Sequence, residues 1–178
     1  MNLSSKRSVV IVAISTFMSA SAAYAQFGAA QGEWQFYGGD AGSTKYSALD
    51  QINAKNVASL EIAWRWKSEN FGPRPLNNYQ VTPLMVGGVL YFTAGHSRVI
   101  IAADAKTGES LWMYRPDEPA RSGPRAGAGR GVAYWTDGAV ERIFAITRGY
   151  LMLALDAKTG HLDQSFGENG ILDLKPGL

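Results

Sequence analysis

The sequence predicts an all-β protein built from β-propeller blades, and three observations carry this prediction. The segment Ala-x-Asp-Ala-Lys-Thr-Gly occurs twice, at 102–108 and at 154–160, so that equivalent residues are 52 positions apart. Similar apolar runs precede both copies. The chain has 20 glycines and 11% aromatic residues but few helical patterns, which favours strands joined by tight turns. Units of roughly 40–50 residues with four strands each are typical of propeller blades.

The first 25 residues are predicted to be a secretory signal peptide and no part of the fold. Lys6 and Arg7 form a positively charged start, an apolar stretch follows at 9–18, and Ala-Tyr-Ala at 23–25 is a small-x-small cleavage site. The alternative is an uncleaved membrane anchor. The pattern therefore predicts an exported, periplasmic protein that is soluble or at most peripherally associated with a membrane.

Residues 26–79 are expected to form an opening segment ahead of the first blade. Only 47–60 offers a helical pattern, enough for a turn or two. Once the signal peptide is removed, 15 basic residues balance 15 acidic ones, because the leader holds two of the 17 basic residues and no acidic one. A neutral chain without a basic run argues against nucleic-acid binding.

Residues 80–129 are predicted to be one blade. Apolar runs at 81–86 and 89–93 flank Gly87-Gly88, a two-residue hairpin signal, because both glycines can adopt positive φ. A third run at 99–102 leads into the first copy of the repeat. A fourth, outer strand is expected after it, starting at Trp112, which should pack between this blade and the next.

Residues 130–178 are predicted to be a second blade with runs at 131–135, 142–146 and 151–154. In both blades the Asp-Ala-Lys-Thr-Gly segment should turn the third strand into the fourth. Its Asp and Thr accept hydrogen bonds from turn N–H groups, and its Gly takes the left-handed conformation. The second copy has Gln164 where the first has Trp, and Phe166 is expected to replace the indole. Two unrelated hairpins that share a turn are the alternative.

The first copy, Ala102, Asp104, Thr107, Gly108 and Trp112, resembles the tryptophan-docking motif of quinoprotein dehydrogenases. These enzymes are eight-bladed propellers that hold pyrroloquinoline quinone (PQQ) on their axis. The segments at 34–66, 130–135 and 156–174 are also similar to this family, the last of them to its glucose-dehydrogenase-like branch. The resemblance implies an N-terminal fragment with the opening segment and about two blades.

By this resemblance, three residues are candidate cofactor-binding positions. Arg130 matches an arginine close to PQQ, and a guanidinium pairs with carboxylate or quinone oxygens. Thr147 matches a threonine that binds a PQQ carboxylate, although a strand-end threonine is the alternative. Gln80 falls where several members have Glu, and a structural role is its alternative. No catalytic residue and no metal ligand is expected in this chain, because the resemblance places the catalytic aspartate and the Ca²⁺ ligands in later blades.

The resemblance implies oxidation of a sugar, polyol or alcohol hydroxyl by hydride transfer to PQQ, with a quinone or cytochrome as electron acceptor. The chain has no cysteine, whereas methanol-dehydrogenase-like members carry two, which favours the sugar or polyol branch. His96 and His161 lack metal-ligand partners at a useful spacing. The glycines at 127, 129 and 131 lead into a β-run, which argues against a dinucleotide loop.

Two other functional classes remain open at this point. A non-catalytic propeller scaffold that binds proteins in the cell envelope would share the docking repeat and the export signal. The long opening segment and the Arg-Gly-Val-Ala-Tyr-Trp segment at 130–135 favour the dehydrogenase over such a scaffold. A translated pseudogene without function is the third alternative.

Overall fold

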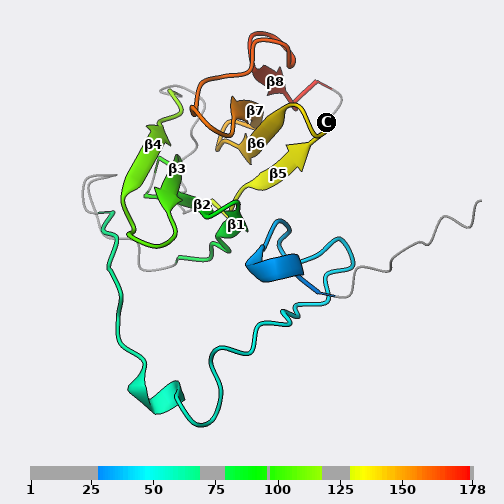
Figure 1. Ribbon diagram of the computed structural model, residues 1–178. Helices are drawn as coiled ribbons and strands as arrows, with labels where there is room; N and C mark the ends of the chain where they lie inside the picture. The colour runs from blue at the N-terminus through cyan, green and yellow to red at the C-terminus, as the bar shows by residue number, and fades with distance from the viewer. Residues whose placement is uncertain (1–27, 69–78, 96, 118–128, 177–178) are drawn as a thin grey trace, which may run out of the picture.

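The computed structural model describes residues 28–68, 79–95, 97–117 and 129–176. The expected signal peptide at 1–25 lies outside the described residues. Within them, regular structure consists of two four-stranded antiparallel sheets and two short 3-10 turns (Figure 1). This confirms the predicted all-β fold, with each sheet corresponding to one blade.

Each sheet is a meander in which strands follow one another in chain order. The first sheet consists of β1 (Leu84–Val86), β2 (Val89–Ala94), β3 (Val99–Asp104) and β4 (Ser110–Tyr114). The second consists of β5 (Ala133–Thr136), β6 (Glu141–Ile146), β7 (Leu151–Asp156) and β8 (Ile171–Asp173).

Local sequence explains where several of these strands begin and turn. Gly87 and Gly88 join β1 to β2 with φ of 56° and 82°, as the hairpin prediction requires. β1 is shorter than the predicted run because it begins only after Pro83, which cannot donate a backbone hydrogen bond. Trp112 lies in the middle of β4 instead of at its start, since pairing with β3 already begins between Ala103 and Ser110.

The main core lies between the two sheets. Side chains from β1, β2 and β3 contact side chains from β6 and β7 in one buried cluster. One face of the first sheet thus packs against one face of the second sheet. Burial of these apolar faces is the principal stabilising term, at roughly 25 cal/mol per Å² removed from water. The buried members are Leu84, Tyr91, Ile100, Ala102, Ile143, Ala145, Leu153, Leu155 and Ala157.

The opposite face of the first sheet is covered by the opening segment. Phe92, Val99 and Ile101 form a second buried cluster, on which Trp66 packs with its ring edge-on to Phe92 at 5.1 Å. The predicted helical stretch at 47–60 contains one 3-10 turn, η2 (Val57–Ser59), and a further 3-10 turn, η1 (Ala30–Gly32), lies near the start.

Two tryptophans dock in the same way onto the two copies of the repeat. The Trp112 indole donates to the Ala157 carbonyl at 2.9 Å, and the Trp64 indole donates to the Ala105 carbonyl at 3.2 Å. Each ring lies directly over the glycine of its turn, because a Cβ on Gly160 or Gly108 would come within 2.6 Å of the ring. The Trp112 contact joins the two sheets, as predicted, whereas the Trp64 contact joins the opening segment to the first sheet.

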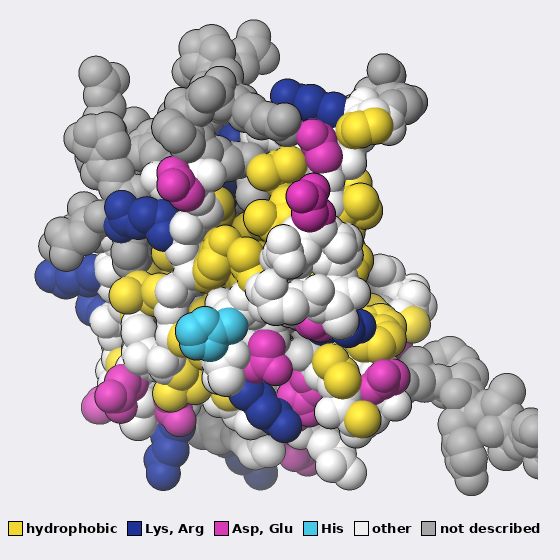
Figure 2. All heavy atoms as spheres, turned by 90° about the horizontal axis from the view of Figure 1, so that it is seen from above, with side chains coloured by type: hydrophobic (Ala, Val, Ile, Leu, Met, Phe, Trp, Pro, Cys, Tyr) yellow, Lys and Arg dark blue, Asp and Glu magenta, His cyan; other side chains and the backbone are white. Residues whose placement is uncertain are grey.

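The described surface carries charges of both signs. Figure 2 shows acidic and basic side chains interspersed with hydrophobic ones over the visible face. Residues 28–68, 79–95, 97–117 and 129–176 contain no helix that is long and apolar enough to cross a membrane.

Candidate cofactor site

The two sheets have two chemically different ends. At one end lie the β1–β2 hairpin and the repeat turn of the first sheet, joined by a hydrogen bond of 2.9 Å from the Ala105 N–H to the Gly88 carbonyl. At the other end β2 and β6 finish and β1 and β5 begin. We call these the turn end and the Thr93 end. Gln80 precedes β1, Arg130 precedes β5 and Thr147 follows β6, so all three candidate residues belong to the Thr93 end.

The chain neighbours of these three residues are linked by direct contacts. The Tyr79 hydroxyl donates to the Thr93 carbonyl at 2.8 Å, next to Gln80. Arg98 donates to the Ile146 carbonyl at 3.4 Å, next to Thr147. These bonds bring segments from β2, β6 and the loop before β1 to one place in the fold.

Arg130 is brought to the same place by the glycines on either side of it. A Cβ on Gly129 would lie 2.7 Å from the Thr93 hydroxyl, and one on Gly131 would lie 3.3 Å from the Thr82 carbonyl. Gly131 also adopts φ of 121°, a conformation that favours glycine. Gly131 leads into strand β5, which agrees with the argument against a dinucleotide loop; Gly127 lies outside the described residues.

The three candidates differ in accessibility. Arg130 and Gln80 are exposed, so both side chains can reach a ligand. Thr147 is 4% exposed, and its hydroxyl accepts the Leu151 N–H at 3.1 Å across the turn from β6 to β7. A structural role as a strand-end threonine therefore has a physical basis, and it does not prevent the hydroxyl from also donating to a ligand.

Charge is distributed unequally between the two ends. Arg98, Arg130 and Arg148 lie in the loops of the Thr93 end. At the turn end, Asp104 and Asp156 each accept hydrogen bonds from the N–H groups two and three residues later. The Thr93 end also has a carboxylate, Asp173, which pairs with Leu151, but its three arginines outnumber it. The Thr93 end therefore suits a ligand that carries negative charge.

The shifted carboxyl pKa values belong to turns and not to this site. The N–H of Thr107 lowers the pKa of Asp104, and the N–H of Val140 lowers that of Asp137. The Ser165 hydroxyl, followed by Arg142, lowers the pKa of Asp163 to about 2. Each of these carboxylates accepts hydrogen bonds in its own turn and stabilises the fold.

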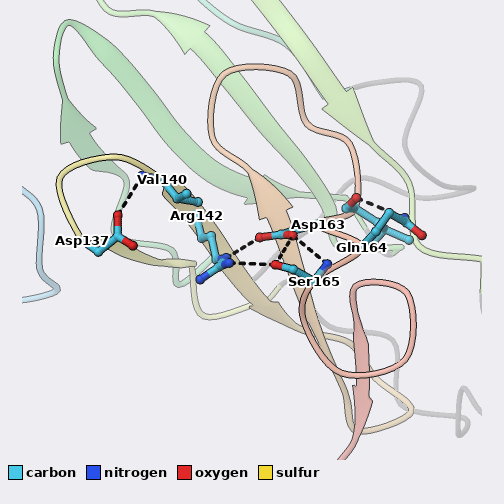
Figure 3. A network of polar contacts seen from close by, with 7 residues as sticks. Asp137, Val140, Arg142, Asp163, Gln164 and Ser165 are labelled. Carbon is cyan, nitrogen blue, oxygen red and sulfur yellow. Dashed lines mark hydrogen bonds and ion pairs between the residues drawn. The ribbon is translucent and has the colours of Figure 1, made fainter.

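Asp163 is part of a polar network on the second sheet (Figure 3). Arg142 on β6 forms an ion pair with Asp163 and donates to the Ser165 hydroxyl at 3.0 Å. Its guanidinium also lies 4.9 Å from the centre of the Trp135 ring. The network fastens the segment at 162–170 to the sheet, so these polar residues have a structural role.

The described residues contain no candidate metal site, because no three His, Cys, Asp or Glu side chains lie close enough together to bind an ion. His161 is exposed at the end of the second repeat turn, and His96 lies outside the described residues.

An anionic, oxygen-rich molecule such as PQQ does fit the Thr93 end. Arginines are present there, and the Thr93 hydroxyl is buried without a hydrogen-bond partner, close to the backbone of Gly129.

Sequence reasoning did not single out Thr93, Tyr79 and Trp64. Thr93 is the one polar residue in the run Val-Leu-Tyr-Phe-Thr-Ala at 89–94, and a polar residue at the end of an apolar strand was the available signal. Trp64 lies 48 residues before Trp112 but is not preceded by an Asp-x-x-Thr-Gly segment, so the motif could not reveal it.

Comparison with known proteins shows the family to which the chain belongs. The family model of the glucose/ethanol/alcohol dehydrogenase β-propeller domain, of the PQQ family, matches residues 34–178. The quinone-dependent alcohol dehydrogenase subunit of Gluconobacter oxydans is 37% identical over 134 residues, which cover 74% of this chain and 16% of that protein. The quinate/shikimate dehydrogenase (quinone) of Acinetobacter baylyi is 33% identical over 172 residues, 83% of this chain and 21% of that protein.

Solved structures give the same result. A quinohemoprotein alcohol dehydrogenase from Pseudomonas putida superposes with a TM-score of 0.59 at 32% identity, over 72% of this chain and 18% of that one. A europium-containing methanol dehydrogenase also gives 0.59, at 29% identity, over 72% of this chain and 22% of that one. The chain thus spans about a fifth of the length of the relatives it matches. It belongs to the family of PQQ-dependent (quinoprotein) dehydrogenases and carries part of their β-propeller domain.

Proposed function

We propose that the protein carrying this chain oxidises a hydroxyl group of a sugar, polyol or alcohol and uses PQQ as the oxidant. The observation that carries the proposal is the match of the PQQ-family propeller to residues 34–178. Relatives named for alcohol, glycerol and quinate or shikimate oxidation support a hydroxyl-bearing substrate. When bound, PQQ supplies the two-electron acceptor for hydride from the substrate carbon.

The chain's own contribution is to bind and orient the cofactor at the Thr93 end. The exposed Arg130 guanidinium pairs with a carboxylate or quinone oxygen, which fixes orientation and offsets negative charge as the cofactor is reduced. Gln80 donates through its amide, and Thr147 through its hydroxyl proton, while that oxygen also accepts the Leu151 N–H.

The proposal extends to the wider context of the enzyme. Ca²⁺ and the catalytic base would come from residues beyond those described. A quinone or a cytochrome would take the electrons, as the names of quinone-linked and quinohemoprotein relatives suggest. We further propose a periplasmic location for a protein that is soluble or at most peripherally associated with a membrane; N-terminal sequencing of the exported protein should then begin at Gln26.

Cofactor titration of the product of the full reading frame that carries this chain tests the proposal. PQQ should quench tryptophan fluorescence in a saturable way and support reduction of an artificial dye by a hydroxyl substrate. R130Q should weaken PQQ binding about 10-fold to 100-fold, because a charge-assisted hydrogen bond is lost. K158Q, which removes an exposed cation at the turn end, should bind PQQ like the unmodified protein.

A folded protein that does not bind PQQ would contradict the proposal. That result would favour the non-catalytic propeller scaffold of the cell envelope.

A further inference from the structure

The Thr93 side chain is buried and lacks a hydrogen-bond partner. The residue is 2% exposed, and its hydroxyl is the one buried side-chain polar atom without a partner in the described part of the chain. The other two buried polar side chains are bonded: Asp40 accepts the N–H groups of Gly28 and Thr44, and Thr147 accepts that of Leu151. An unpaired buried hydroxyl destabilises a fold, so a partner outside the described residues is expected for it.

The contacts around this hydroxyl hold the Thr93 backbone in place and bring the backbone of Gly129 close to it. The Tyr79 hydroxyl binds the Thr93 carbonyl at 2.8 Å, which fixes the end of β2. The loop before β5 approaches Thr93 closely because residue 129 is glycine; a Cβ there would lie 2.7 Å from the hydroxyl oxygen and 3.3 Å from Cβ of Thr93. Any other residue at position 129 would crowd this hydroxyl.

The charges nearby indicate what kind of group would pair with it. Arg130 follows Gly129 directly, and a Cβ on Gly129 would also lie 3.4 Å from the Arg98 side chain. Arg130 and the hydroxyl are hydrogen-bond donors, so a group that pairs with both must be an acceptor. Arg98, which donates to the Ile146 carbonyl, adds positive charge nearby. An anionic oxygen, such as that of a carboxylate, is the acceptor that this combination of donors binds best.

We propose that the Thr93 hydroxyl donates a hydrogen bond to a carboxylate oxygen of bound PQQ, next to Arg130, and is a cofactor-positioning group in addition to the three residues given by the family resemblance. This inference rests on the proposed function. The unpaired hydroxyl then destabilises the cofactor-free protein, and its contribution to the free energy becomes favourable only when the cofactor is bound.

The Thr93→Val substitution tests the inference, because valine keeps the shape of threonine and removes only the hydroxyl. In the full-length protein we expect T93V to bind PQQ about 10-fold to 100-fold more weakly by fluorescence titration. The melting temperature of the cofactor-free T93V protein should be unchanged or higher. T93S keeps the hydroxyl and should keep most of the affinity, and G129A should bind PQQ more weakly because its Cβ crowds the hydroxyl.

The matched control is Thr136→Val at the turn end. The Thr136 hydroxyl accepts the Gly138 N–H at 2.9 Å, so T136V should lower the melting temperature and leave PQQ affinity unchanged. Equal affinity of T93V and the unmodified protein would overturn the inference and leave the proposed function standing. A T93V protein that melts as early as T136V would also overturn it, since the hydroxyl would then be structural. A folded, unmodified protein that does not bind PQQ would overturn both.

Discussion

The first three strands and the repeat turn that follows them are arranged alike in the two sheets, but the segments after this turn differ. In the first sheet β4 begins two residues after Gly108 and carries Trp112. In the second sheet the segment at 162–170 separates the turn from a three-residue β8, and no tryptophan follows. The docking motif therefore has two structural roles: it turns the chain, and its tryptophan joins neighbouring blades. The second sheet has the turn without the tryptophan.

The aromatic that replaces Trp112 in the second sheet is Phe166. The Tyr91 ring lies 5.9 Å from that of Trp112, and the Phe144 ring lies 5.3 Å from that of Phe166. Tyr91 and Phe144 occupy equivalent positions, because each pairs with the first alanine of its repeat copy.

The equivalence of the two aromatic pairs is incomplete. Trp112 also donates to the Ala157 carbonyl on the other sheet, whereas phenylalanine has no donor. A conserved turn geometry therefore does not by itself provide the hydrogen bond between blades.

Removal of the inter-sheet tryptophan should have the largest effect. W112A deletes a ring that packs on the main core and leaves the Ala157 carbonyl without its indole partner. We expect a loss of about 3–5 kcal/mol in the free energy of unfolding, measured by urea denaturation. W135A is the control, since Trp135 is 40% exposed, and it should cost much less. Equal losses would mean that the contact between the sheets does not depend on Trp112.

The glycine beneath Trp112 gives the next largest expected effect. A Cβ on Gly160 would lie 2.6 Å from the ring, and the residue has φ of 72°, so G160A should cost about 2–4 kcal/mol from overlap and backbone strain together. G138A is matched to it, because Gly138 has φ of 92° and a Cβ added there would meet no atom within 4 Å. It should cost about 1–2 kcal/mol from strain alone. If chemical denaturation gave equal losses in the free energy of unfolding for G160A and G138A, the contact between Trp112 and Gly160 would not contribute to stability.

Loss of the Phe166 ring should matter less than loss of Trp112. F166A removes an edge-on ring contact within one sheet, and we expect a cost of about 1–2 kcal/mol. F36A, at a ring that is 43% exposed, should stay within about 0.5 kcal/mol of the unmodified protein. A cost for F166A as large as that for W112A would show that Phe166 replaces the tryptophan fully.

The ion pair that fastens the segment at 162–170 should have the smallest effect, and that effect should depend on pH. The pKa of Asp163 is lowered to about 2 in the fold, so its stabilising contribution is complete above its ordinary value near 3.8 and is lost as the pH falls toward 2. D163N should cost about 1 kcal/mol or less at pH 7, because the pair is partly exposed. Unfolding curves between pH 2 and 7 should converge for the two proteins at low pH; a constant difference would contradict this role.

Local features of the sequence determined much of this fold. The Gly87-Gly88 hairpin and the first repeat turn form as predicted, because their hydrogen bonds and positive φ angles involve residues only a few positions apart. The second repeat turn has the same hydrogen bonds, but it does not lead directly into the fourth strand as predicted, because the segment at 162–170 precedes β8. The strand runs and the four-strand units were also readable, since alternating apolar residues and turn signals recur along the chain. Family resemblance added Gln80, Arg130 and Thr147, whose roles stay predictions.

Tertiary structure decided which distant residues meet. Trp64 docks on the first repeat turn 41 residues away, and Phe166 reaches Phe144, although no motif links either pair. Thr93 and Gly129 are separated by 36 positions, and only packing of the two sheets brings the glycine against the hydroxyl. A turn is specified by neighbouring residues, whereas these contacts depend on how two complete sheets are placed by their shared apolar core.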